Sequence, residues 1–404
     1  MRTLSVRVLI AGGGVGGLSL AQGLRREHVE VAVFERDPAA VARGQGYRLR
    51  IDAQGDDALA ACLPDDLFEL YRATSNRPYM SRGNAFDDQL NLIFSAGVAP
   101  GPFDPAKAST AVNRLTLRQV LLAGLDDVVH FGHELVHVER SGTGVLARFA
   151  SGASAEGDVL VGADGINSAV RRQLLPHASM IDTGLRAVYG HATLDTEMLA
   201  LLPGSLFGGT SSILGPGQLT MALGTFQPSR PLGEAAAQIA PYARLDPVPD
   251  YMKWTLVAPT GSFALPEHEL WDADPVTLTR LAAQMTQGWH PAIRGLLARS
   301  DASITFFLAI RSARPVAAWP PGRVTMLGDA IHATTPVGGT GANVALRDAA
   351  LLTRCLADVD RRRADLLGAI SEYESRMRDY GFGAVANSLR GAERIFRMET
   401  IALS

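Results

Sequence analysis

The hydrophobic positions at the start of the chain predict two buried strands joined by a helix. Residues 6–10 and 30–34 are almost unbroken apolar runs, which is typical of parallel strands covered on both faces. Between these runs, the apolar residues of 18–24 recur at helical spacing. The chain therefore opens with a strand–helix–strand unit, and we expect an α/β fold.

The middle of the chain has a different pattern, in which short β segments replace the alternation of strand and helix. Such segments lie at 186–192, 218–223 and 251–257, and residues 89–94 have the same character. We expect them to form one sheet. The proline-rich stretch 228–249 is expected to be a surface connection.

Composition narrows the class of protein only slightly. The chain has 404 residues, 47% of them apolar and 20% charged, which predicts an ordinary globular protein with two domains. A net charge of −3 gives no general attraction to nucleic acid or anionic membranes. Cys62 and Cys355 lack metal or redox spacing, which favours a reducing cytoplasm. Lys107 and Lys253 are the only lysines, so nearly all positive charge is arginine.

A glycine-rich turn follows the first predicted strand and reads Gly12-x-Gly14-x-x-Gly17. Gly12 permits a tight turn, Gly14 leaves room for a pyrophosphate, and Gly17 lets the next helix lie close to the sheet. The phosphates would bind the free N–H groups at the start of that helix, near Val15. The turn alone is a weak signal, but the strand–helix–strand context favours a dinucleotide.

An acidic residue ends the second predicted strand. Glu35 stands 23 residues after Gly12, where its carboxylate can accept both ribose hydroxyls of an adenine nucleotide. A carboxylate at this position repels a 2′-phosphate, so the turn suits FAD or NAD better than NADP. Arg36 follows and is placed to lie along the adenine.

Two later turns have the same form, a strand that ends in an acidic residue and glycine. Asp164 follows strand 158–162 and is placed to orient backbone amides or a phosphate-bridging water, although it could also cap the next helix. Asp329 follows the strand near 324 and can hold a ribityl hydroxyl. Pro336 fixes the next turn, and the helix starting at 341–343 would offer unpaired N–H groups to the negative edge of reduced flavin.

The chain resembles the single-component class A flavin monooxygenases, the family of p-hydroxybenzoate hydroxylase, in three separate fingerprints. These are Gly12-x-Gly14-x-x-Gly17 with Glu35, Gly-Ala-Asp164-Gly165 with Ser168 and Arg171, and Gly328-Asp329 with Pro336 and Gly341-Ala-Asn343. The resemblance extends from about residue 5 to about residue 355. It also implies that Arg114 contacts FAD and that Arg48 lies near the pyrophosphate or the flavin.

This resemblance implies a Rossmann-like FAD-binding domain, an inserted β-sheet domain that binds substrate, and a C-terminal helical tail. The expected FAD-binding domain comprises 1–75, 100–182 and 290–350, the substrate domain 76–99 and 183–289, and the tail 351–404. The residues expected to bind FAD are Gly12, Gly14, Val15, Gly17, Glu35, Arg36, Arg48, Arg114, Asp164, Asp329, Pro336, Gly341, Ala342 and Asn343.

The substrate pocket is harder to place. In the family, the inner face of the inserted sheet lines this pocket. Tyr189 and His191 share one face of their predicted strand, so either could hydrogen-bond a phenol or carbonyl, although both could also be satisfied by neighbouring residues. Arg186 could pair with an acidic substrate or lie on the surface.

His133-Glu134-Leu-Val-His137 matches a zinc-protease pattern, which needs both histidines on one face of a helix. The surrounding valines and Gly132 indicate β structure instead. In an extended chain the two imidazoles would lie about 13 Å apart, too far for one zinc ion. We therefore expect no metal.

This resemblance implies an NAD(P)H-consuming monooxygenase. In such an enzyme a hydride would reduce FAD, O₂ would add at flavin C4a, and the hydroperoxide would deliver one oxygen atom to an aromatic or polycyclic small molecule. NADH or NADPH would bind without a fingerprint of its own. An FAD-dependent oxidase or dehydrogenase of a secondary metabolite and a non-catalytic FAD-binding homologue stay open. We expect a monomer or homodimer in the cytoplasm, with no nucleic-acid or membrane partner.

Overall fold

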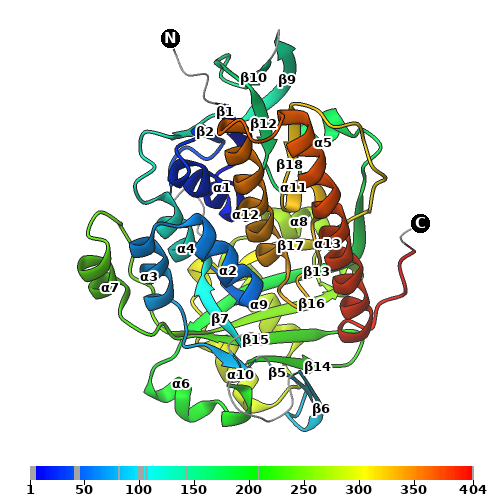
Figure 1. The fold of residues 1–404 in the computed structure, drawn as a ribbon. Helices are drawn as coiled ribbons and strands as arrows, with labels where there is room; N and C mark the ends of the chain where they lie inside the picture. The colour runs from blue at the N-terminus through cyan, green and yellow to red at the C-terminus, as the bar shows by residue number, and fades with distance from the viewer. Residues whose placement is uncertain are drawn as a thin grey trace.

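The fold was taken from a computed structural model, which describes residues 6–40, 46–80, 82–97, 104, 108–141, 144–207 and 209–402 (Figure 1). Lys107 lies outside these residues. No helix among them combines the length and the hydropathy needed to cross a bilayer.

A five-stranded parallel sheet forms around the N-terminal strand, in the order β18-β12-β1-β2-β8. Its strands are β1 (Arg7–Ala11), β2 (Glu30–Glu35), β8 (Val129–Phe131), β12 (Val159–Gly162) and β18 (Val324–Met326). Helix α1 (Val15–Arg26) joins β1 to β2, so the predicted strand–helix–strand unit is confirmed. Val8, Leu9 and Ile10 are fully buried because both faces of the sheet are covered.

The middle of the chain forms a seven-stranded sheet, in the order β17-β13-β16-β15-β14-β5-β6. Its strands are β5 (Arg82–Asp87), β6 (Leu92–Gly97), β13 (Met180–Thr193), β14 (Thr210–Leu214), β15 (Thr220–Phe226), β16 (Tyr251–Pro259) and β17 (Phe306–Ala313). The expected β segments therefore belong to one sheet. The segment predicted at 89–94 becomes a strand only from Leu92, because the Asp87 carboxylate accepts the N–H groups of Gln89 and Asn91 in a hairpin turn.

The two faces of the seven-stranded sheet have different neighbours. One face presents Val188, Trp254 and Leu256 to a hydrophobic core that helices α6, α9 and α10 cover. Strand alternation turns Tyr189 and Lys253 to the opposite face. That face lies against a small sheet in the order β3-β7-β4, whose strands are β3 (Arg48–Asp52), β4 (Tyr79–Met80) and β7 (Ala108–Asn113).

The remaining strands form a three-stranded antiparallel sheet, and the helices pack around all four sheets (Figure 1). The strands are β9 (Leu135–Ser141), β10 (Gly144–Phe149) and β11 (Ser154–Gly157). The other helices are α2 (Ala53–Cys62), α3 (Asp65–Ala73), α4 (Arg114–Leu122), α5 (Ala169–Leu174), α6 (Thr196–Leu201), α7 (Leu232–Ile239), α8 (Glu267–Asp272), α9 (Pro275–Met285), α10 (Pro291–Ala298), α11 (Asp329–His332), α12 (Gly341–Asp360) and α13 (Leu366–Ile395).

Two long helices end the chain. Figure 1 shows α12 and α13 side by side, with α12 also packed on α1. Residue 351, the first of the expected tail, lies inside α12, and β17 joins the seven-stranded sheet from within 290–350. The division into domains stays a prediction. The proline-rich stretch 228–249 contains helix α7, which packs against α3.

Candidate functional site

The glycine-rich turn between β1 and α1 has a shape that only glycine permits at two positions. Gly12 has φ +114°, and a Cβ there would overlap the carbonyl group of Ala163. A Cβ on Gly17 would overlap the carbonyl oxygen of Gly12. Gly14 is different, because a Cβ there would meet no atom within 4 Å. The space in front of Gly14 is thus open, at the start of a helix whose N-terminus no side chain caps.

The carboxylate of Glu35 braces this turn from the end of β2. One oxygen accepts the N–H of Gly13 at 2.6 Å, and the other accepts the N–H of Asp37 at 2.9 Å. On the other side, Arg118 donates to the carbonyl of Gly13 at 2.9 Å. Arg36 is exposed. The carboxylate therefore lies beside the first two glycines, where the resemblance puts the ribose.

Asp164 caps helix α5, as the alternative reading allowed. Its Oδ2 accepts the N–H groups of Ala169 and Val170 at 2.7 and 3.2 Å. Its Oδ1 is buried and has no hydrogen-bond partner among the described residues. A buried carboxylate oxygen without a donor is costly, so this atom fits a ligand hydroxyl or a bound water.

Asp329 begins α11 and faces the start of α12. Its Oδ1 lies 3.8 Å from the position of a Cβ on Gly341. The side chain is exposed, yet desolvation by the surrounding protein raises its pKa, against the charges of His332 and Arg114. A solvent-exposed carboxyl with a raised pKa is explained if Asp329 lies in a deep space that is open to solvent. The N-terminus of α12 opens on the same space without a side-chain cap.

Asn343 joins the start of α12 to β3. Its Oδ1 accepts the N–H of Asp52 at 2.9 Å, and its Nδ2 donates to the carbonyls of Arg50 and Gly339 at 2.9 and 2.8 Å. Pro336 is exposed, and its carbonyl accepts the N–H of Gly339. The side chain of Asn343 therefore fixes the helix start against β3.

A buried network behind Asp329 was missed by the sequence analysis. Asp348 accepts hydrogen bonds from the N–H of Gly328 at 2.8 Å and from the hydroxyl of Tyr380 at 2.7 Å, and pairs with His332 at 2.6 Å. Desolvation lowers the pKa of His332, but the Asp348 carboxylate outweighs it and the net shift is upward. The network locks the turn before Asp329 onto α12 and α13.

Arg114 and Arg48 lie between the small sheet and the seven-stranded sheet. The guanidinium of Arg114 lies 5.5 Å from the ring centre of Tyr47, whose carbonyl accepts the N–H of Arg114. Arg48 donates to the carbonyl of Thr225 at 2.7 Å and to the hydroxyl of Tyr79 at 2.6 Å. Arg114 is thus on the side of Asp329, and Arg48 is held against β15.

Tyr189 and His191 both lie in the interior. The Tyr189 ring stacks on Phe306 at 5.0 Å and meets Tyr47 edge-on at 5.9 Å, while His191 stacks on Tyr251 at 4.3 Å. Within the described residues, neither the hydroxyl of Tyr189 nor Nδ1 of His191 has a hydrogen-bond partner, although both side chains are buried. Two such atoms on one face of a strand fit a bound ligand.

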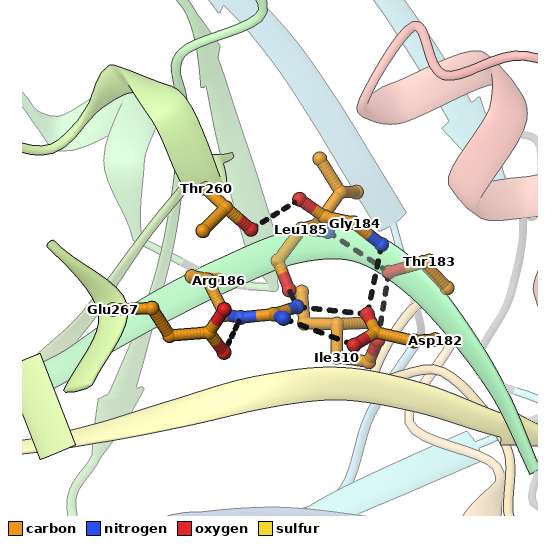
Figure 2. A network of polar contacts seen from close by, with 8 residues as sticks. All are labelled: Asp182, Thr183, Gly184, Leu185, Arg186, Thr260, Glu267 and Ile310. Atoms are coloured by element: carbon orange, nitrogen blue, oxygen red, sulfur yellow. Dashed lines mark hydrogen bonds and ion pairs between the residues drawn. The ribbon is translucent and has the colours of Figure 1, made fainter.

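The structure corrects both expectations for Arg186, which neither lies on the surface nor is free for a substrate. Figure 2 shows its guanidinium between the carboxylates of Asp182 and Glu267, at 2.8 and 2.7 Å. Its side chain is only 6% exposed. Arg186 stabilises the irregularity of β13 between Asp182 and Arg186, where Gly184 has φ +72°.

The two histidines of the H-E-x-x-H pattern are not on a helix. His137 lies in β9, and His133 lies just before it, where its Nδ1 contacts the carbonyl of Phe131 at 2.8 Å. The described residues contain no cluster of three or more groups suited to a metal ion.

The three turns together fit FAD. Open space at Gly14, an unpartnered oxygen on Asp164, and the uncapped start of α12 beside Asp329 are sites for a pyrophosphate, a hydroxyl and an electron-rich ring edge. These features come from three distant turns, and within the described residues no protein group occupies the position that the cofactor would take.

Comparison with known proteins agrees with this geometry. Residues 290–388 match a family described as an FAD binding domain. A solved structure from Photorhabdus luminescens, described as an FAD-containing monooxygenase, is 33% identical with a TM-score of 0.83, over 97% of this chain and 99% of that one. A Klebsiella pneumoniae protein crystallised with FAD and uric acid shares the fold at 23% identity and a TM-score of 0.74, over 96% of this chain and 88% of that one.

Curated relatives agree as well. A dual O-methyltransferase/FAD-dependent monooxygenase from Phaeosphaeria nodorum is 31% identical over 97% of this chain and 46% of its own length. The aurachin C monooxygenase/isomerase of Stigmatella aurantiaca is 29% identical over 95% of this chain and 88% of its own length. The chain spans about half the length of the first of these relatives. On the Photorhabdus match above all, the chain belongs to the family of FAD-dependent monooxygenases, of the class A type that its three fingerprints resemble, and FAD is its cofactor.

Proposed function

We propose that this enzyme uses NAD(P)H and O₂ to insert one oxygen atom into an aromatic or polycyclic small molecule. The observation that carries the proposal is the position of the aromatic cluster Tyr47, Tyr189 and Phe306, which adjoins Arg114 and thus the deep space at Asp329. A flat substrate can stack on these rings next to the reacting end of FAD.

The FAD-binding roles of individual residues are part of this proposal. Glu35 accepts the ribose hydroxyls, and Arg36 lies along the adenine. Gly12, Gly14, Val15 and Gly17 form the pyrophosphate turn. Asp164 orients a phosphate-bridging water through its unpartnered oxygen, and Asp329 holds a ribityl hydroxyl. Arg114 and Arg48 lie nearer the flavin end, and Pro336 shapes the loop before α12.

When bound, FAD supplies the redox chemistry by passing two electrons from NAD(P)H to O₂. The protein supplies orientation, charge stabilisation and exclusion of water. Among the described residues no side chain caps the N-terminus of α12, so the backbone N–H groups of its first turn, at Gly341 and Ala342, would stabilise negative charge on the cofactor without reorganising. Asn343 keeps that helix start rigid against β3 through three hydrogen bonds.

The seven-stranded sheet closes the other side of the pocket. Tyr189 and His191 offer a hydroxyl and a ring nitrogen that no described residue uses, so they are the proposed substrate contacts. The overall reaction consumes NAD(P)H, a proton, O₂ and substrate, and yields NAD(P)⁺, water and a product with one added oxygen.

The test is NAD(P)H oxidation by the holoenzyme, screened against phenols, quinones and indoles under ¹⁸O₂. We expect a fitting substrate to stimulate NAD(P)H oxidation and to give a product that contains one ¹⁸O atom. A product oxidised without ¹⁸O would show an oxidase or dehydrogenase instead. A yellow protein that oxidises NAD(P)H with none of these compounds would support a non-catalytic FAD-binding role.

A further inference from the structure

A histidine and a lysine in one row on the inner face of the seven-stranded sheet lie beside an arginine from β3 of the small sheet. Lys253 on β16 pairs directly with His191 on β13 and with Gly224 on β15, so all three share that face. A Cβ on Gly224 would lie 3.3 Å from the guanidinium carbon of Arg48. The absence of a side chain at Gly224 therefore lets the guanidinium lie beside Lys253.

These two cations are not neutralised by a carboxylate in the described part of the chain. The bonds of Arg48 go to the carbonyl of Thr225 and the hydroxyl of Tyr79. The ammonium of Lys253 has only Thr255 Oγ1, at 3.4 Å. A buried guanidinium and a partly buried ammonium side by side without a counter-ion are costly unless an anion joins them.

The other titratable groups around Lys253 add no negative charge at neutral pH that could neutralise the two cations. Desolvation lowers the pKa of His191, against a smaller opposing effect of Asp301, and so keeps its imidazole neutral. Desolvation also raises the pKa values of Tyr189 and Tyr251, which keeps both hydroxyls protonated. Among the described residues, Arg48 is thus the permanent charge that acts on the lysine.

Lysine itself is a notable choice at this position. The chain carries 38 lysines and arginines together, and all but Lys107 and Lys253 are arginine. Arginine stays charged at every physiological pH, whereas a lysine in a desolvated site can lose its proton. Desolvation and the charge of Arg48 lower the pKa of Lys253 to about 7. The side chain of Lys253 can therefore lose its positive charge near neutral pH.

We propose that Lys253 and Arg48 form an oxyanion site that binds the ionised hydroxyl of an aromatic substrate. The aromatic side chains of Tyr189 and Phe306 lie in the neighbouring row and would hold the ring to which that oxygen is attached. The free hydroxyl of Tyr189 and Nδ1 of His191 provide further polar contacts. This inference rests on the proposed function and names the substrate class of the same pocket.

The proton transfer from substrate to protein needs no other reactant. When a phenol binds to the neutral amine, its O–H proton moves to Nζ of Lys253, and the product is an ammonium–phenolate pair beside Arg48. An ionised hydroxyl makes its ring more electron-rich and so more reactive toward an electrophilic oxygen. Lys253 is a substrate-binding residue in this account, and Arg48 positions the charge.

The experiment measures binding of 2,4-dinitrophenolate to the FAD-loaded enzyme by calorimetry, from about pH 6 to about pH 9. This probe stays ionised over that range, so any pH dependence comes from the protein. We expect wild-type affinity to fall by at least about 10-fold as pH rises through 7, because the neutral amine no longer attracts the anion. In two buffers of different ionisation heat, binding at the upper pH should take up close to one proton per site.

Two variants separate a titrating cation from a structural side chain. Lys253→Arg keeps the charge, so its affinity should change by less than about 2-fold over the same range and no proton should be taken up. Lys253→Met should bind the probe about 10-fold more weakly than wild type at pH 6, again without pH dependence. The FAD absorbance and circular dichroism of each variant check that it folds.

A second measurement uses the wild-type side chain and does not depend on these variants folding. In a Lys107→Arg background, reductive ¹³C-methylation labels one lysine, whose NMR shift reports its pKa and its response to the probe. Absence of probe binding, equal pH dependence in Lys253→Met, or a Lys253 signal that ignores the probe would each overturn the inference. Because none of these readouts requires turnover, a failed ¹⁸O experiment would count only against the proposed reaction.

Discussion

A substitution at Gly14 can separate an effect on cofactor binding from an effect on folding. Neighbouring Gly12 and Gly17 have no room for a methyl group within the protein, so their substitution would disturb the turn itself. Gly14 faces open space and has φ −79°, which alanine adopts without strain. A methyl group there would therefore meet only the cofactor.

We predict that Gly14→Ala leaves the melting temperature of the apoprotein within about 2 °C of wild type and raises the FAD dissociation constant by on the order of 10-fold or more. Fluorescence titration with FAD checks this. Gly233→Ala is the matched control, since Gly233 in α7 also faces open space but lies away from the three turns, and its affinity should be unchanged. Equal affinity in both variants would place the pyrophosphate elsewhere.

Glu374 in α13 makes the stability of the protein depend on pH. It is 3% exposed, and desolvation raises its pKa to about 7, although Thr325 donates to its carboxylate at 2.8 Å. An unfolded chain releases this proton near pH 4.5. Between these two pH values the folded state binds more protons than the unfolded state, so stability falls as pH rises.

Glu374→Gln removes this ionisation and keeps a hydrogen-bond acceptor for Thr325. We predict that the variant is more stable than wild type at pH 8, by up to about 3 kcal/mol, and equal to it at pH 4. Denaturant unfolding at both pH values measures the difference. Glu372→Gln, on an exposed position of the same helix, should change stability by less than about 0.5 kcal/mol at either pH. A Glu374→Gln variant no more stable than wild type at pH 8 would contradict this explanation.

Residues whose role depends on local backbone shape could be predicted from the sequence. Gly12, Gly17 and Glu35 lie within one strand–helix–strand unit, so their spacing alone fixes their geometry. Lys253 and Tyr47 could not be found in this way, because β16 and the segment before β3 meet only through tertiary packing. The small number of lysines was visible in the sequence, but no pattern indicated that one would be interior.

At the scale of the element, β13 is a strand whose regular pairing is interrupted by a local irregularity. It pairs with β16 and β17 along its length, and an irregularity between Asp182 and Arg186 shifts its register against β17. The Arg186 guanidinium fills this irregularity and joins two carboxylates (Figure 2). The part of the strand at 186–192 was predicted from the sequence, whereas its start at Met180 and the irregularity were not, and the irregularity depends on Glu267 from a helix 81 residues away.

We predict that Arg186→Ala lowers the free energy of unfolding by about 1–3 kcal/mol, because two carboxylates lose a buried partner, while FAD still binds. Chemical denaturation and the flavin absorbance measure the two effects. Arg299 is the matched control. It also joins two carboxylates, Asp195 and Glu197, but its side chain is 40% exposed. Arg299→Ala should cost less than about 1 kcal/mol. If both variants lost equal stability, burial would not explain the contribution of Arg186.

At the scale of the whole molecule, the proposed pocket depends on separate layers meeting. The parallel sheet and α12 supply the three turns, the seven-stranded sheet supplies the aromatic and basic residues, and β3 and β7 lie between them. The sequence predicted both sheets, since their patterns are local. It could not predict which faces would oppose each other, nor that α12 would run unbroken past residue 350 and pack on both α1 and α13.

The central claim is that turns at Gly12–Gly17, Asp164 and Asp329–Asn343 hold one FAD between them. The most direct measurement is the ratio of FAD to protein after the purified chain has been incubated with excess FAD and passed through gel filtration, read from the visible absorbance of the flavin. The account predicts one FAD per chain. A protein that emerges colourless from the column would contradict it.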